Sequence, residues 1–253
     1  MKPGEPDSGA ASIRLELIQT RWSLIRQAHT LSGGTPDSAR NALVMRYGSS
    51  VRRYVGALLR DDHDADEVAQ DVVVRMLRGD FGKADPTRGR FRDLLKTAIR
   101  NMVKNHWDKQ NRRKPVEHDL ELLPGTGDQK DDQWDDAWKT NVLDLAWGAL
   151  QSYEETHAGS IAYTLLKLRS DYPEDNSEKL AERLTKATGR QVKAEAIRQQ
   201  LRRSRVRFAE LLVTEVANGL ETAEPDRVKD ELIALGLYET VREFLPPEWN
   251  AKA

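Results

Sequence analysis

Apolar side chains recur every three or four residues along most of the chain, which is the spacing of one face of an α-helix. Alternation of apolar and polar residues, the pattern of a β-strand, is scarce, and Ala, Leu, Arg, Glu and Lys dominate the composition. These residue types favour helices. The pattern therefore predicts an all-α protein.

Four helices are expected before residue 113. The first covers about residues 12–31 and stops at Gly33, and the second follows Pro36 and fades at residues 61–62. The third ends near Gly79, and its apolar face consists of Ala65, Val68, Ala69, Val72 and Met76. After a loop over residues 79–89, a fourth helix carries a basic side opposite an apolar side made of Phe91, Leu94, Leu95, Ala98, Ile99 and Met102.

A segment rich in Pro, Gly and acidic residues, 114–132, is the best candidate for a linker. It predicts one helical domain at residues 1–113, a second at 133–215 and a helical extension at 216–253. In the second domain, a short helix that begins at Ser177 and a tight corner at Gly189 precede a longer helix with Ile197, Leu201, Ser204 and Phe208 facing inward. This is the pattern of a helix-turn-helix unit.

Charge is unevenly distributed although the formal net charge is −1. Residues 88–114 contain ten Lys and Arg against two Asp, and residues 186–207 contain eight against one Glu. Between them, residues 117–136 carry eight acidic side chains and one Lys. Two basic blocks of this density favour contacts with nucleic acid, and the alternative is a solvated helix face that keeps the protein soluble.

The residues around the basic side chains refine this prediction. In the first block, Asn101, Asn105 and His106 offer hydrogen bonds, whereas Trp107 is interpreted first as a core residue and second as a stacking surface for a base. In the second block, Arg198, Arg202 and Arg205 share one side of the helix, flanked by Gln199 and Arg203. Arginines in such a row can contact phosphates and guanine bases in the major groove.

Several function classes are not expected. The chain has no Cys, its five His show no metal-ligand spacing, and Gly33-Gly34 lacks the residues of a phosphate-binding loop. We therefore expect no enzyme, no cofactor and no metal site. Apolar runs are too short to span a membrane, and residues 1–11 resemble a frayed terminus more than a signal peptide, so a cytoplasmic location is expected.

Two stretches in the first half closely resemble region 2 of extracytoplasmic-function (ECF) sigma factors, members of the sigma-70 family. They are RYGSSVRRYVGALLRDDHDADEVAQDVVVRMLRGDF at residues 46–81 and ADPTRGRFRDLLKTAIRNMVKNHWDKQNRR at residues 84–113. Residues 177–212, with RQQLRRSRVRFAELL, are similar to region 4 of the same family. Residues 20–24, the ADPTRGRF loop and the Asp-Glu-Leu of the tail resemble the group abundant in planctomycetes, here with a C-terminal extension.

The resemblance implies a role in transcription initiation on core RNA polymerase. It assigns docking on the β′ clamp helices to Asp64, Asp66, Glu67, Gln70 and Asp71, and it implies a further contact of region 4 with the β flap. It assigns contacts with the minus-ten element of promoter DNA to Arg88, Arg90, Arg92, Lys96, Arg100, Asn101 and Lys104. It places in the major groove of the minus-thirty-five element Lys193, Arg198, Gln199, Arg202 and Arg203. An anti-sigma factor or a regulatory kinase would be a further partner.

Two other functions remain open at this point. The chain could be a helical adaptor or an anti-sigma-like regulator that binds proteins alone. It could also be a repressor that binds duplex DNA through the helix-turn-helix without polymerase. Promoter-selective transcription by added core polymerase separates both from a sigma factor.

Overall fold

The computed structural model describes residues 36–81, 90–113, 129–220, 222–245 and 249. Within these ranges every regular element is a helix, which confirms the all-α prediction. The helix expected at residues 12–31, the loop at 82–89 and residues 114–128 of the expected linker lie outside the described residues.

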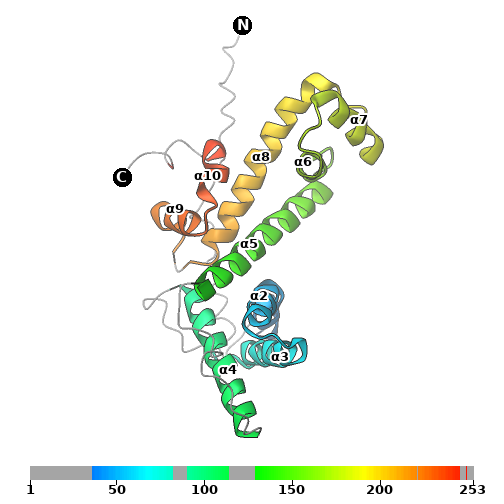
Figure 1. Cartoon of the computed structure of the whole chain (residues 1–253). Coiled ribbons are helices and arrows are strands. Elements are labelled where there is room, and N and C mark those ends of the chain that lie inside the picture. The colour runs from blue at the N-terminus through cyan, green and yellow to red at the C-terminus, as the bar shows by residue number, and fades with distance from the viewer. Residues whose placement is uncertain (1–35, 82–89, 114–128, 221, 246–248, 250–253) are drawn as a thin grey trace. The chain divides into compact units, whose positions relative to one another are not determined.

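The described helices, most of which are labelled in Figure 1, group into two compact units. The first unit contains α2 (Pro36–Leu58), α3 (Asp62–Arg78), α4 (Phe91–Arg113) and the part of α5 (Gln129–Thr156) that ends at Val142, together with residues 217–223.

The second unit begins within α5, at Leu143. It contains α6 (Ala162–Asp171), α7 (Ser177–Thr188) and α8 (Ala194–Ala217) as far as Val216. From Glu224 onward it also contains the tail, which consists of α9 (Pro225–Ala234), α10 (Tyr238–Val241) and the 3-10 helix η4 (Arg242–Phe244).

Aromatic side chains join the beginning of α5 to the first unit. Trp138 stacks on Tyr47 of α2 with 5.1 Å between ring centroids, and Trp134 lies 5.0 Å from the ring of Tyr54. All four side chains are buried. Because large aromatic side chains dominate core energetics, this half of α5 clusters with α2, α3 and α4. The division of the described helices therefore falls at residues 142–143, which differs from the boundary expected at 114–132.

Local sequence signals define both ends of α3. The carboxylate of Asp61 caps the helix by accepting hydrogen bonds from the backbone N–H groups of His63 (2.9 Å) and Asp64 (3.0 Å). At the other end, Gly79 adopts a left-handed conformation with φ of 83°, which a glycine tolerates without strain. The apolar face expected for this helix is buried.

A separate core holds α6, α7 and α8 together. It contains Leu165, Leu180, Ala181, Leu184, Ile197 and Leu201. Gly189 ends α7 with φ of 70°, and α8 begins five residues later, at Ala194. Ile197, Leu201 and Ser204 face inward as expected, whereas Phe208 is half-buried against Trp147, with 5.0 Å between ring centroids.

The tail belongs to the same unit as α8. Val228, Leu232, Leu235 and Val241 are buried, in agreement with the apolar spacing along the sequence. Arg205 of α8 lies over the ring of Phe244, 6.0 Å from its centroid. One of the arginines in the α8 row therefore contacts the tail.

Candidate nucleic-acid interface

The polar face of α3 presents exposed acidic and amide groups. Glu67, Gln70 and Asp71, three of the five side chains predicted to dock on polymerase, are exposed. Asp66 forms an ion pair of 2.7 Å with Arg52 of α2, and both side chains remain largely in solvent. Exposed ion pairs contribute about 0–1 kcal/mol, so a partner can displace Arg52 at small cost.

Asp64 differs from the other four residues because it is half-buried and contacts α4. The amide Nε2 of Gln110 donates to both carboxylate oxygens of Asp64 at 2.9 Å. His106 Nε2 lies 3.3 Å from Asp64 Oδ1. In the described conformation, Asp64 therefore connects α3 to α4 within the first unit.

Two exposed apolar residues extend the same face of α3. Val74 is 39% exposed and Leu77 is 38% exposed. They follow Gln70 by four and seven residues, which places them on the same side of the helix. Charge counting did not identify them as candidates. The sequence does contain a signal for an additional apolar surface, because the three consecutive residues Val72-Val73-Val74 cover more of the helix than one buried apolar stripe requires.

The basic side of α4 lies opposite a buried face of Phe91, Leu95, Ile99, Met102 and Val103. Asn101 and Lys104 are exposed. Lys96 and Arg100 are half-buried and interact with other groups of the chain. Trp107 is half-buried. Two of these four predicted DNA-contacting residues are therefore exposed, and the other two already interact with groups of the chain.

The three arginines before and at the start of α4 have different surroundings. Arg90 Nε donates to Asp93 at 2.8 Å and is half-exposed. Arg92 is buried, with a side chain 5% exposed, and its guanidinium donates to Asp135 of α5 at 3.1 Å. Arg88 lies outside the described residues. The structure thus gives Arg92 a place in the core of the first unit, so we remove it from the set that we expect to contact DNA.

The five residues predicted to read DNA in the second unit all lie at the surface. Lys193 precedes α8, and the first three turns of α8 carry Arg198, Gln199, Arg202 and Arg203, each exposed. Among the described residues, no carboxylate lies within ion-pair distance of these four basic side chains. Their charges are therefore available to an anionic partner.

A pocket of 760 Å³ adjoins this surface of α8. Arg202, Arg203 and Arg207 line it together with the end of α5 and the turn before α6. Arg207 is already engaged, because it forms an ion pair of 2.6 Å with Glu210 and lies over the ring of Tyr153. The pocket did not follow from sequence reasoning, because its walls come from segments about 40–50 residues apart.

A comparison with known protein families matches part of the first unit. Residues 43–113, which span most of α2, all of α3 and α4, match the family described as Sigma-70 region 2. Over these residues the chain is similar to region 2 of sigma-70 factors. No curated protein and no solved structure matches the chain. Among the described residues, no helix is both long enough and apolar enough to cross a membrane.

Proposed function

We propose that this chain is a sigma factor of the ECF type, a non-catalytic subunit that directs core RNA polymerase to specific promoters in the cytoplasm. The observation that carries the proposal is the Sigma-70 region 2 match over residues 43–113, which covers most of α2 and all of α3 and α4 in the first unit. Sigma-70 factors act with core polymerase and promoter DNA, and the chain offers one acidic and two basic surfaces for these partners.

The acidic surface is the exposed face of α3. Glu67, Gln70 and Asp71 would form polar contacts with the polymerase clamp, and Asp66 would exchange Arg52 for a basic group of the partner. Val74 and Leu77 would add apolar area beside them. Charged groups at the rim of an interface steer association, while the buried core of an interface is more apolar than its rim.

The two basic surfaces would bind two segments of the same promoter. Lys104 and Asn101 of α4, with Lys96, Arg100, Arg90 and Arg88, would hold the opened strand of the minus-ten element, where unpaired bases and phosphates are accessible. In the second unit, we propose that α7 and α8 form a helix-turn-helix. Lys193, Arg198, Gln199, Arg202 and Arg203 would then enter the major groove of the minus-thirty-five element.

Binding of the full-length chain to purified core polymerase tests the docking surface. The triple variant Glu67→Ala/Gln70→Ala/Asp71→Ala is expected to weaken this binding by more than tenfold, because it removes polar groups at a single continuous face. The control is Asp226→Ala/Asp230→Ala, which removes two exposed acidic groups from α9 and is expected to bind like the wild type.

Other outcomes would favour other functions. No affinity for core polymerase, combined with tight binding to duplex DNA, would indicate a helix-turn-helix repressor. Binding to polymerase without any change in promoter choice would indicate an adaptor. Equal losses in the triple variant and the α9 control would show that net charge, and not the α3 face, determines binding.

A further inference from the structure

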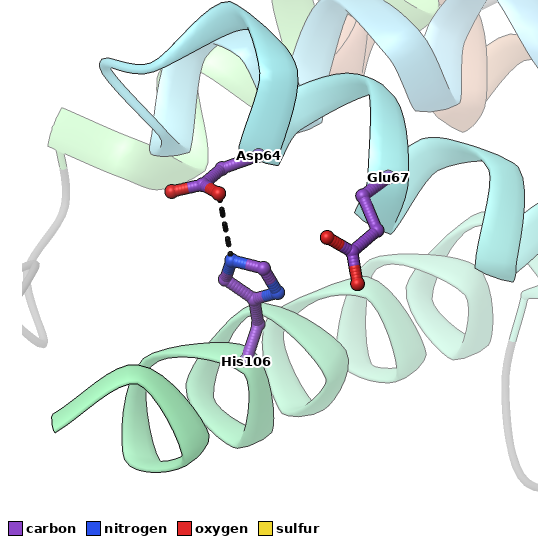
Figure 2. Close-up of side chains that lie close together, drawn as sticks. All are labelled: Asp64, Glu67 and His106. Atoms are coloured by element: carbon purple, nitrogen blue, oxygen red, sulfur yellow. Dashed lines mark ion pairs between the residues drawn. The ribbon is translucent and has the colours of Figure 1, made fainter. Parts of the chain in front are cut away.

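Three side chains with metal-binding donor atoms meet between α3 and α4 of the first unit. Asp64 and Glu67 lie one helical turn apart on α3, and His106 projects from α4 towards them (Figure 2). One donor atom from each residue lies within 4.8 Å of the other two. The imidazole side chain is 10% exposed, so it is held in a largely buried position between the helices.

The donor set is that of a transition-metal site. One imidazole nitrogen and two carboxylate oxygens suit Zn²⁺, Co²⁺ or Ni²⁺, whereas Mg²⁺ and Ca²⁺ prefer oxygen ligands throughout. Bonds of about 2.0–2.2 Å to such an ion bring bonded donor atoms within roughly 4 Å of one another. The exposed side chain of Glu67 can close the small remaining difference by rotating about its own bonds.

Gln110 holds the Asp64 carboxylate in place. Its amide donates to both oxygens at 2.9 Å, and the second lone pair of each oxygen stays available to an ion. Outer partners of this kind orient the ligands in metal sites. The same amide lies 3.1 Å from His106 Nε2, and the donor–acceptor assignment of that contact depends on the imidazole tautomer.

Positively charged side chains nearby limit the affinity of these three residues for a divalent cation. Arg75 and Lys109 line a neighbouring hollow of 140 Å³ together with Glu67 and His106. Their charges oppose a divalent cation, and three protein ligands leave the remaining coordination positions to water. Binding is therefore expected to be weaker than in structural sites that have four protein ligands.

We propose that Asp64, Glu67 and His106 form a binding site for a divalent transition-metal ion that connects α3 to α4. The bound ion replaces the direct contact between His106 and Asp64 and leaves a solvent molecule in at least one coordination position. Asp64 and Glu67 also belong to the acidic face discussed above, so an occupied site places a cation within that face.

Calorimetric titration of the untagged, chelator-treated full chain with Zn²⁺ tests the site directly. One ion per chain is expected to bind, and Co²⁺ is expected to give a visible absorption spectrum with a nitrogen–oxygen ligand set. His106→Ala and Glu67→Gln should each weaken Zn²⁺ binding at least tenfold. Because the chain has no Cys, thiolates cannot contribute to the signal.

The matched control is His63→Ala, which removes an exposed imidazole from the first turn of α3 and should leave Zn²⁺ binding unchanged. Glu67→Gln keeps the result interpretable if His106→Ala fails to fold, because the Glu67 side chain is exposed. The absence of saturable binding with Zn²⁺ in tenfold excess over the protein would overturn the proposal. Binding that survives both ligand variants, or that His63→Ala abolishes, would overturn it as well.

Discussion

Removal of two arginines from α8 should weaken binding to the upstream promoter element strongly and in a salt-dependent way. Arg202 and Arg203 are adjacent, exposed and without an ion-pair partner among the described residues. A bidentate contact of arginine with guanine contributes about 1–3 kcal/mol, and two such contacts therefore account for about 2–6 kcal/mol, or at least about 30-fold in affinity. If both side chains contact phosphates instead, the slope of log affinity against log salt should fall by about 1.8.

The assay is binding of fluorescent promoter duplex to polymerase reconstituted with the chain, at several salt concentrations. A second duplex with a scrambled upstream element measures how much of the loss concerns sequence recognition. The control is Arg227→Ala/Arg242→Ala, which removes the same formal charge from exposed side chains of the tail that pair with Glu224 and Glu239. We expect this control to change affinity by no more than a few-fold.

Two results would contradict a specific role of Arg202 and Arg203 in DNA binding. If Arg202→Ala/Arg203→Ala bound like the wild type at every salt concentration, the exposed row on α8 would have no part in DNA binding. If the tail control lost as much affinity, the effect would be one of total charge, and the geometry of α8 would not explain it.

Three further predictions concern the units that support these surfaces. Trp134→Ala should lower the free energy of unfolding in urea by about 3–5 kcal/mol. Trp134→Phe should lower it much less, because the buried indole N–H has no hydrogen-bond partner among the described residues. Equal losses in the two variants would contradict this. Gly189→Ala should cost about 1–2 kcal/mol in the same measurement, since its φ of 70° strains any residue with a Cβ, and Gly189→Asn should cost less. Asp61→Ala should lower the midpoint of thermal unfolding at neutral pH but not in strong acid. The hydrogen bond from the Asp64 N–H holds the pKa of Asp61 below its ordinary value of 3.8. The contribution of Asp61 to stability is therefore present above that value and disappears as the pH falls through the lowered pKa. A difference in the unfolding midpoint between wild type and variant that persists in acid would argue against the cap.

Periodicity predicted which side of each helix is buried, but it could not say what covers that side. The buried stripe of α3 and the inward residues of α8 follow directly from a 3.6-residue repeat. The same repeat marks Trp134 and Trp138 as apolar-face residues of α5, yet their partners, Tyr54 and Tyr47, lie about 80 and 90 residues earlier in the chain. A sequence-based boundary at the acidic segment therefore separated residues that pack together.

Counting charges likewise could not show which charged side chains are exposed at the candidate surfaces. It identified the exposed groups Lys104, Arg198 and Arg203 correctly as surface cations. It could not distinguish them from Arg92, because the burial of that side chain depends on Asp135, 43 residues away on α5. Long-range pairs of this kind leave no local pattern in the sequence.

For the acidic residues of α3, the sequence could not distinguish a residue that contacts another helix from its exposed neighbours. Asp64 resembles its exposed neighbours in sequence, but Gln110 and His106 draw it into contact with α4. The grouping of Asp64, Glu67 and His106 also escaped a search for ligand spacing, because 39 residues separate His106 from Glu67 in the chain. Metal-binding patterns are recognisable in sequence chiefly when the ligands share a loop or a helix.

Transcription in vitro from a library of promoter fragments, with purified core polymerase and the full-length chain, shows whether the chain directs polymerase to promoters. We expect transcripts that depend on the chain and start at a fixed distance downstream of two shared sequence elements, with the upstream element losing its influence in the Arg202→Ala/Arg203→Ala variant. An unchanged set of start sites with and without the chain would contradict this expectation.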